Sequence, residues 1–259
     1  MRFPKILSRT AYSRYERELE KEILEGPMPR HIAMIMDGNR RYANEIMNSD
    51  SNDGHKKGEE KIEEMLDWCL RLKIQYVTVY AFSTENFKRD KEEVDFLMDL
   101  SEAALYRMAD HKKIHDNKVR IRVFGDHSTL PESVREAIRY ADERTSSYTD
   151  YSFNVAMAYG SRQEILSAVK DIARKVADHE LDVNDISEKT FSEHLYTSEL
   201  PDPDLILRTS GEVRMSNFLL WQLAYSELYF TDVYWPGFRY IDFLRAIRSY
   251  QQRVRRYGE

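Results

Sequence analysis

The sequence predicts an α/β protein with a central, mostly parallel sheet of six strands and helices on both of its faces. Three observations predict this class. Six short runs rich in β-branched and aromatic residues alternate with longer segments of helical periodicity. The strand-like runs are nearly continuous in apolar residues, as expected of strands buried on both faces. Internal repeats, low-complexity tracts and long linkers are absent from the 259 residues, so we expect one main domain.

The first predicted element is a helix from about Ser8 to Glu25, whose apolar side chains are spaced toward one face. Gly26, Pro27 and Pro29 then end this helix. We expect residues 1–28 to form a helical extension and residues 29–259 to form a single domain. The extension packs on the body, on a second subunit or on a membrane surface, and its mixed charge disfavours strong binding to anionic lipid.

The strands and helices of the domain follow in alternation. Apolar residues such as Val94, Leu97 and Met98 recur at helical spacing in the longest helical segment, and Pro131 suits the first turn of the helix that it opens. The strands are predicted at residues 31–36, 77–82, 119–125, 151–160, 204–209 and 227–233. The helices are predicted at residues 54–72, 92–115, 131–144, 161–177 and 241–255.

Composition and charge exclude several classes of protein. With a net charge of −6 and a pI of about 5.8, the chain lacks the excess of cations that general nucleic-acid binding needs. A single cysteine, Cys69, excludes an internal disulfide framework and a multi-cysteine zinc site, and favours a reducing compartment. The amino terminus is too charged for a signal peptide, and the longest uncharged apolar stretch, residues 215–226, is shorter than the roughly 20 residues of a membrane span. We therefore expect a cytoplasmic protein, with membrane contact at its surface only.

Polar and cationic residues follow three of the predicted strands and open another. In open α/β sheets, ligands bind at the carboxyl ends of the strands, so these residues are candidates for a site. An edge rich in cations on an acidic protein predicts a small anionic ligand, most simply phosphate or diphosphate. The candidate segments are residues 37–41 (DGNRR), 83–89 (STENFKR) and 208–217 (RTSGEVRMSN), together with Glu227 at the start of the sixth strand.

Each candidate has a structural explanation as well as a functional one. The run Asp37-Gly38-Asn39 is typical of a turn followed by a helix cap. Alternatively, Asp37 holds a divalent cation, and the backbone N–H groups that follow it are directed at phosphate. Arg40 and Arg41 suit a solvated helix face or an arginine fork for phosphate oxygens. Because separate loops converge on one edge of the sheet, we favour the functional explanation, a site for an anionic ligand. Ordinary structural roles are equally open to the other candidates, namely His55, Arg208, Arg214 and Glu227.

At these segments the chain resembles the cis-prenyltransferases, the undecaprenyl diphosphate synthase family, and its archaeal members in particular. The matching runs are HIAMIMDGNRRYA, YAFSTENFKR, LILRTSGEVRMSNFLLWQLAYSELYFTD and VYWPGF, in the family's order between residues 29 and 247. The resemblance implies the α/β fold of these enzymes, with a hydrophobic tunnel. It also implies Mg²⁺-dependent, sequential condensation of isopentenyl diphosphate with an allylic diphosphate, either geranylgeranyl or farnesyl diphosphate. The implied product is a medium- or long-chain Z-polyprenyl diphosphate, the precursor of a glycosyl carrier lipid.

The resemblance further implies roles for individual residues. Asp37 would be an essential catalytic residue that helps to hold Mg²⁺ on the allylic diphosphate, and Asn86 matches the family's proposed proton acceptor. Glu227 matches a carboxylate that contributes to metal binding from the neighbouring subunit of a homodimer. The substrate-binding positions are Gly38, Asn39, Arg40, Arg41, Tyr42, His55, Ser83, Thr84, Glu85, Phe87, Arg89, Arg208, Arg214, Met215 and Ser216.

The tunnel would be walled by helices. The burial pattern and the resemblance both favour the segments around residues 97–108 and 66–70 as its walls. The polar segment 84–93 is expected to be a mobile lid over the site. A long apolar product implies a peripheral contact with a membrane at release.

The sequence departs from the family pattern at several positions. Tyr42 and Phe87 stand where the family often has tryptophan, and Val213 stands where it often has histidine. Residues 43–54 lack the glycines and the arginine that bacterial members usually carry. The ending Arg256-Tyr257-Gly258 resembles that of archaeal and eukaryotic relatives, which is thought to reach a partner's active site.

Three alternatives to an elongating enzyme stay open at this point. They are prenyl transfer to an acceptor other than isopentenyl diphosphate, a non-catalytic partner subunit of a heteromeric prenyltransferase, and an aspartyl-nucleophile phosphatase. Non-catalytic subunits typically lose the metal-binding aspartate, whereas Asp37 is present. The phosphatase chemistry usually needs a second acid two residues later, where this chain has Asn39.

Overall fold

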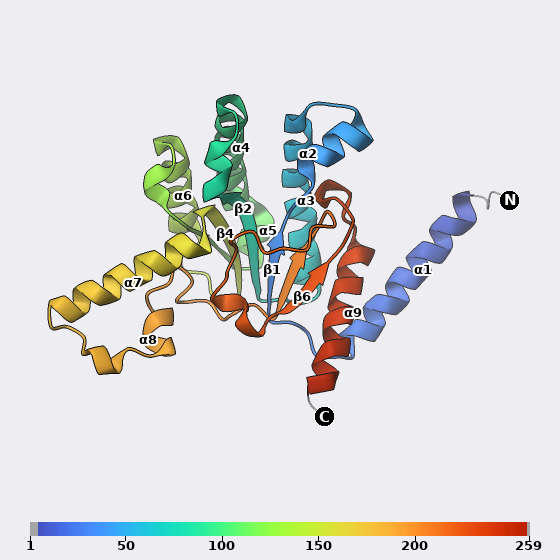
Figure 1. The fold of residues 1–259 in the computed structure, drawn as a ribbon. Coiled ribbons are helices and arrows are strands. Elements are labelled where there is room, and N and C mark those ends of the chain that lie inside the picture. The colour runs from blue at the N-terminus through green and yellow to red at the C-terminus, as the bar shows by residue number, and fades with distance from the viewer. Residues whose placement is uncertain (1–4, 258–259) are drawn as a thin grey trace.

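The six predicted strands form one sheet in the computed structural model, which describes the backbone of residues 5–257 and the side chains of residues 13–253. The strand order is β3-β4-β2-β1-β5-β6, and every neighbouring pair is parallel (Figure 1). The predicted α/β class with a central parallel sheet is confirmed. The strands are β1 (His31–Ile35), β2 (Tyr76–Ser83), β3 (Val119–Phe124), β4 (Tyr151–Tyr159), β5 (Leu205–Arg208) and β6 (Glu227–Phe230).

Helices cover both faces of the sheet, as the buried strands require. Figure 1 shows α7 and α8 beside one face and α3, α4 and α6 beside the other. Four of the five predicted helices of the domain are present as single helices, with boundaries within a few residues of the expectation. The helices are α1 (Lys5–Leu24), α2 (Asn39–Tyr42), α3 (Ser51–Arg71), α4 (Lys91–Asp110), α5 (Lys112–Asp116), α6 (Glu132–Thr145), α7 (Ser161–Ala177), α8 (Glu188–Ser192) and α9 (Tyr240–Tyr257).

The single long helix predicted at residues 92–115 is wrong, because it is divided into α4 and α5. His111 lies between them with an extended backbone (φ −69°, ψ 125°), and its Nδ1 accepts a hydrogen bond from the backbone N–H of Lys113. Buried apolar residues, Met108 before the break and Ile114 after it, preserve the periodic pattern across it. The sequence pattern therefore hid the break.

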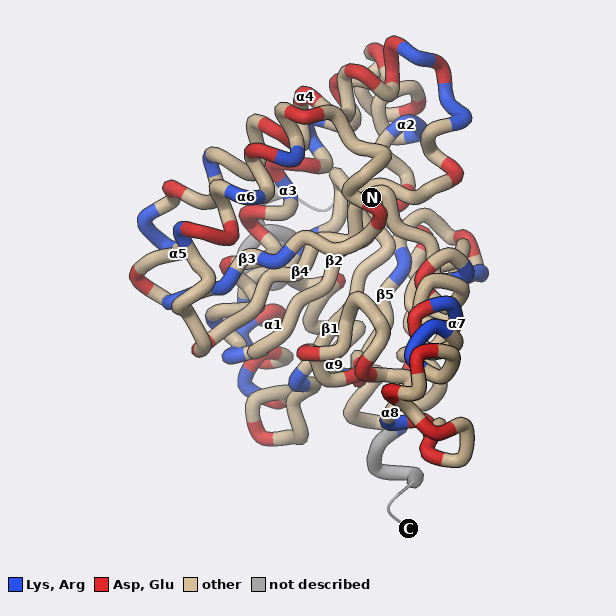
Figure 2. The backbone as a smooth tube through the Cα atoms, turned by 90° about the vertical axis from the view of Figure 1, so that its left-hand side faces the viewer, with Lys and Arg blue, Asp and Glu red and all other residues tan. Residues whose placement is uncertain are grey.

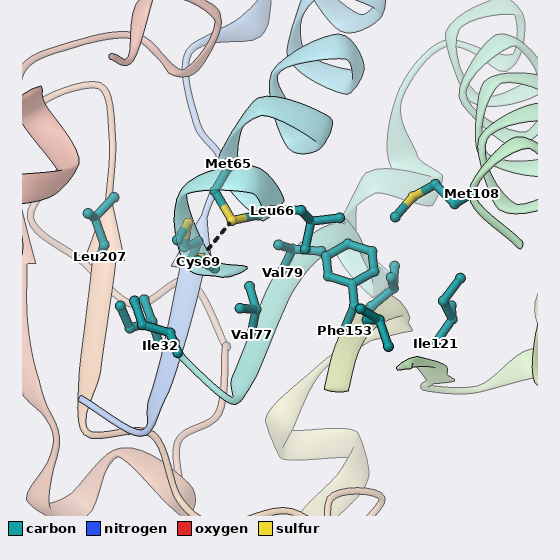
Figure 3. Close-up of a cluster of buried hydrophobic side chains, with 14 of the residues drawn as sticks. Ile32, Met65, Leu66, Cys69, Val77, Val79, Met108, Ile121, Phe153 and Leu207 are labelled. Atoms are coloured by element: carbon teal, nitrogen blue, oxygen red, sulfur yellow. Dashed lines mark hydrogen bonds between the residues drawn. The ribbon is translucent and has the colours of Figure 1, made fainter. Parts of the chain in front are cut away.

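Two apolar clusters hold the layers together. The larger cluster joins one face of the sheet to residues of α3, α4, α6 and α9, and Figure 3 shows Met65, Leu66 and Cys69 of α3 packed near the strands. The smaller cluster covers the other face, where Phe218 and Leu219 are buried against the strands. Figure 2 shows that charged residues lie mainly on helices and loops, whereas the strands are largely uncharged.

The predicted amino-terminal helix is present as α1. Its carboxyl-terminal half packs on α9, with Leu19 and Ile23 fully buried, and its amino-terminal half extends away from the body (Figure 1). The Gln251 side chain of α9 donates a hydrogen bond of 2.7 Å to the Ile23 carbonyl oxygen and so fixes this junction. The division of the chain at residue 28 stays a prediction.

No helix within the described residues combines the length and the apolar character needed to cross a membrane. The cytoplasmic location stays a prediction. The side chains of the expected Arg256-Tyr257-Gly258 motif lie outside the described residues.

Candidate active site

A polar pocket of about 580 Å³ lies at the carboxyl ends of β1, β2 and β5. Parallel strands place these ends at one edge of the sheet, which is where the sequence predicted a ligand. The polar lining consists mostly of residues that the sequence singled out. They are Asp37, Asn39, His55, Ser83, Glu85, Asn86, Arg89, Arg208, Arg214 and Ser216, joined by Asn217.

Asp37 lies two residues after the end of β1 and is held in place by Thr209, the residue that follows β5. Its backbone N–H donates to Thr209 Oγ1 at 2.9 Å, and that hydroxyl donates to the Asp37 carbonyl oxygen at 2.7 Å. Gly38 then takes a left-handed φ of 105°, which favours glycine. This turn leads directly into α2 and fixes the direction of the Asp37 side chain.

The Asp37 carboxylate faces two arginines. Arg208 Nη2 donates to its Oδ2 at 2.8 Å, and Arg41 Nη2 lies 3.6 Å from its Oδ1. Burial by itself would raise the pKa of Asp37, but hydrogen bonds from Arg208 and Ser210 outweigh it, and the pKa is lowered. Asp37 is therefore ionised at neutral pH, as a metal-binding carboxylate must be.

Arg208 ties this aspartate to the loop that follows β5. Its side chain is only 4% exposed, and its Nη1 donates to the Arg214 carbonyl oxygen and, at 2.7 Å, to Ser216 Oγ. Arg214 itself is exposed and pairs with Glu212. Ser210 and Ser216 have left-handed φ values of 80° and 48°, so the loop is held in an unusual conformation by these contacts.

Two buried polar atoms of the pocket lining have no partner among the described residues. They are Asn39 Oδ1 and Arg208 Nε. Buried polar groups are nearly always hydrogen-bonded, so such atoms in a pocket lining are expected to meet a ligand or water. The backbone of Asn39 packs closely against α3 at Gly54. A Cβ atom at Gly54 would lie 2.1 Å from the Asn39 carbonyl oxygen, so only glycine allows this close approach.

The segment that follows β2 forms a short 3₁₀ helix, η2 (Thr84–Lys88), over one side of the pocket. Asn86 Oδ1 accepts the Ser83 backbone N–H at 2.9 Å, which closes a capping box at the start of η2. Glu85 Oε1 accepts a hydrogen bond of 3.1 Å from Asn217 Nδ2, so η2 is attached to the loop after β5. That residues 84–93 move as a lid stays a prediction.

The opposite wall is built from α2, α3 and α4. Here His55 Nε2 lies 3.1 Å from Glu93 Oε1, and Arg89 and Arg40 lie 3.0 Å and 3.8 Å from the same carboxylate. Burial lowers the pKa of His55, and its hydrogen bond to Glu93 only partly opposes this effect. The sequence indicated the three nitrogen-bearing residues, whereas it considered Glu93 only as the last residue of the expected lid.

Several predicted site residues lie outside the pocket lining. Arg41 and Gly38 adjoin Asp37, Thr84 lies within η2, and Arg40, whose side chain is largely exposed, lies beside Glu93. Phe87 packs edge-on against Phe82, and the partly buried Met215 packs on the smaller apolar cluster. Tyr42 lies against Gly237.

Glu227 does not join the other candidates within one chain. It opens β6, and its Cα pairs in register with that of Leu205 at the start of β5. Because β5 and β6 are parallel, Glu227 lies at the amino edge of the sheet, opposite Asp37, where it accepts a hydrogen bond of 2.9 Å from Arg253. The expectation that it shares an edge with Asp37 is wrong for a single subunit.

An apolar cavity of about 110 Å³ adjoins the polar pocket, between α3, α4 and the sheet. Both are lined by Met36, Asn39, His55, Ala81 and Leu97. The cavity continues along α4 to Leu105 and Met108, within one of the two segments expected to form a tunnel. The other segment, at Leu66 and Leu70, lines a separate small cavity of about 40 Å³ that shares Met108 and Phe153 with the first.

The donors present fit a Mg²⁺ ion that is held partly by the substrate. Mg²⁺ at phosphate sites takes one or two carboxylates, phosphate oxygens and water. Asp37 supplies such a carboxylate, ionised and lining the pocket. The described residues contain no group of three or more His, Cys, Asp or Glu side chains that would bind a metal by themselves. A substrate diphosphate would therefore have to complete the coordination.

Residues 35–258 match the family model described as putative undecaprenyl diphosphate synthase. The chain belongs to this family. It is therefore a prenyltransferase, and the resemblance inferred from the motifs is confirmed.

Archaeal relatives are similar over nearly the whole chain. A tritrans,polycis-undecaprenyl-diphosphate synthase (geranylgeranyl-diphosphate specific) of Thermoplasma volcanium is 54% identical over 94% of this chain and 94% of its own length. A Methanocaldococcus jannaschii protein of the same name is 54% identical over 95% of this chain and 88% of its own. The lavandulyl diphosphate synthase of Lavandula x intermedia, solved with dimethylallyl diphosphate, superposes with a TM-score of 0.81 at 36% identity, covering 86% of this chain and 95% of that one.

Proposed function

We propose that this prenyltransferase extends an allylic diphosphate with isopentenyl diphosphate in repeated Mg²⁺-dependent condensations, giving a medium- or long-chain Z-polyprenyl diphosphate. The junction between the cation-lined pocket and the apolar cavity supports this proposal most directly. A growing prenyl diphosphate has the matching chemistry, because its head is highly charged and its tail is apolar. The names of the archaeal relatives favour geranylgeranyl diphosphate over farnesyl diphosphate as the primer.

The two walls of the pocket suit two diphosphate groups. Arg40, His55 and Arg89 would hold the allylic diphosphate near Asp37, and Arg214 and Ser216 would hold isopentenyl diphosphate. Arginine forks match phosphate oxygens in geometry and charge. The remaining substrate contacts implied by the family motifs, at Gly38, Arg41, Tyr42 and their neighbours, are part of the same proposal.

In the reaction, the C–O bond of the allylic diphosphate breaks, the alkene of isopentenyl diphosphate forms the new C–C bond, and a proton leaves the product. The arginines would stabilise the charge that builds up on the departing diphosphate. Bound Mg²⁺, held by Asp37, would supply Lewis-acid neutralisation of that charge. Asn86, on the pocket wall after β2, is our candidate for the group that receives the proton.

We also propose that the protein works as a homodimer in which Glu227 of one subunit contributes to metal binding in the other. Because Glu227 lies at the edge of the sheet opposite Asp37 of its own chain, a role at the metal would require a second subunit. We propose that the apolar cavity is the inner part of a tunnel for the growing chain, and that the product, the precursor of a glycosyl carrier lipid, leaves by peripheral contact with a membrane.

The proposal is tested by incubating the purified protein with Mg²⁺, labelled isopentenyl diphosphate and either geranylgeranyl or farnesyl diphosphate. We expect label in a series of longer prenyl diphosphates, most with the geranylgeranyl primer, and none after addition of EDTA. Label that enters no product with either primer would contradict the proposal, and label in a product with one added unit only would restrict it to a single condensation.

A further inference from the structure

Glu93, in the first turn of α4, is surrounded by nitrogen-bearing side chains from separate segments. Its Oε1 accepts a hydrogen bond of 3.0 Å from Arg89 Nη1 and lies 3.1 Å from His55 Nε2. Its Oε2 lies 3.8 Å from Arg40 Nη1. The Glu93 side chain is only 14% exposed. Three groups that would hold the allylic diphosphate therefore converge on one carboxylate.

The carboxylate is the only acidic partner of these three groups among the described residues. Arg40 belongs to α2, His55 to α3, and Arg89 caps the end of η2. Two guanidinium groups on one pocket wall repel each other, and a shared carboxylate offsets this repulsion while it fixes their directions. The same contact requires the proton of neutral His55 to be on Nε2, the atom that faces the carboxylate.

This set of contacts is separate from those of the second wall. Arg208 and Ser216 are held to each other and to Asp37, and Arg214 pairs with Glu212. Within the described residues, the hydrogen bonds and ion pairs of Glu93 are with His55, Arg89 and Arg40 and with none of these. A change at Glu93 should therefore affect one diphosphate subsite and spare the other.

We infer that Glu93 is a positioning residue, which holds Arg40, His55 and Arg89 in place for the allylic diphosphate. This inference rests on the proposed function, because it assumes that the pocket takes prenyl diphosphates. In this inference Glu93 does not touch the substrate; it acts through the three side chains that do. Glu92 precedes it in the same helical turn, is exposed and provides a matched control.

The first test compares E93Q with E92Q and the wild type in steady-state kinetics. We expect E93Q to raise KM for geranylgeranyl diphosphate about tenfold and to change KM for isopentenyl diphosphate less than about twofold, since only one subsite loses its charge-assisted hydrogen bonds. E92Q should behave as the wild type, and E93D should recover part of the loss. Equal increases in both KM values, an equal effect of E92Q, or a lower KM for the primer would overturn the inference.

The second test follows the pH dependence of primer affinity. His55 faces the carboxylate of Glu93 from α4, Arg89 after η2 and Arg40 from α2. Glu93 raises the pKa of His55 against the effect of burial, so the charged form of His55 should appear at lower pH in E93Q. We expect the rise in primer affinity on acidification to move to lower pH in E93Q and to stay in place in E92Q. An unchanged profile would show a role other than positioning.

A binding measurement separates this inference from the proposed function. Calorimetric titration with geranylgeranyl diphosphate alone requires no turnover. We expect weaker binding by E93Q than by E92Q and the wild type. Suppose that the wild type binds the primer more tightly than E93Q does, but adds no isoprene units to it. The proposed function then fails and the inference stands. If all three proteins bind equally while the wild type elongates, the inference alone is wrong.

Discussion

Asp37 and Arg208 meet across the ends of β1 and β5, where the Arg208 side chain donates a hydrogen bond of 2.8 Å to the Asp37 carboxylate. We predict that Asp37→Asn lowers turnover by about 100-fold or more, because it removes the ionised carboxylate that would hold Mg²⁺. The amide oxygen still accepts the Arg208 hydrogen bond, so the thermal midpoint should change little. Product formation and melting are measured in parallel, with Asp99→Asn on the exposed face of α4 as the control. Full activity of Asp37→Asn would refute the assigned role.

Arg214 is exposed and contributes little to folding, so its substitution reports on the substrate. We predict that Arg214→Ala raises KM for isopentenyl diphosphate about tenfold and changes KM for the allylic primer much less. The reason is that Arg214 belongs to the loop after β5, where its carbonyl oxygen and the Ser216 hydroxyl both accept hydrogen bonds from Arg208. Steady-state kinetics with each substrate varied in turn provide the measurement. The control is Arg174→Ala, whose side chain is exposed on α7 and whose loss should change neither constant. Equal changes of the two KM values in Arg214→Ala would contradict the assignment.

At the residue scale, the sequence located candidates that lie at or shortly after a strand end, and it did not indicate contacts that depend on distant segments. Asp37, Asn86 and Arg208 were located by their place at strand ends. Glu93 was missed because its partner His55 is 38 residues away in a different helix. Ser210 lies in the predicted segment 208–217, but its 2.7 Å hydrogen bond from Arg41, at a separation of 169 residues, was not predicted for the same reason.

At the scale of elements, α3 and α4 enclose the apolar cavity, and α4 presents different residues to it and to solvent. Ala104 lines the cavity, whereas its neighbour Ala103 is exposed. We predict that Ala104→Phe shortens the products by several isoprene units, because the larger side chain fills space that the growing chain would occupy. Ala103→Phe should leave the product length unchanged. Chromatography of the dephosphorylated products gives the comparison, and an unchanged distribution for Ala104→Phe would contradict a tunnel at this place.

The same helix shows what periodicity can and cannot predict. Apolar spacing at Leu97 and Met108 correctly indicated a buried face, which also lines the cavity. Periodicity did not indicate the break at His111, because Ile114 continues the apolar pattern in α5. Nor did it indicate the π-helix at residues 43–47, whose formation depends on how the chain packs between α2 and α3.

At the scale of the whole molecule, alternation of strands and helices predicted the parallel sheet but not the order of its strands. The strand order decides which strands have neighbouring carboxyl ends. It places β1 between β2 and β5, so that the three functional loops converge, and it leaves β6 at an edge. Local sequence carries little information about strand order, because the order is set by packing of the connecting helices. For Glu227, the first residue of β6, the direction of the strand was the deciding fact that the prediction overlooked.

The position of β6 at the edge of the sheet leads to a prediction about assembly. Tyr225, two residues before this strand, is fully exposed, and an edge strand beside an exposed aromatic ring is typical of a surface that another chain covers. If the proposed homodimer forms here, sedimentation should give about twice the 30.8 kDa of one chain. Tyr225→Asp should give a monomer with reduced turnover, since it places a charge in the interface and separates Glu227 from the neighbouring site.

Val183 provides the control for this prediction, because it is 63% exposed in a short helical turn far along the chain from β6. Val183→Asp introduces the same charge and should leave both the mass and the turnover unchanged. A dimer that survives Tyr225→Asp would place the interface elsewhere. A wild-type protein that sediments as a monomer with full activity would show that one chain completes its own site, and that the metal-binding role of Glu227 is wrong.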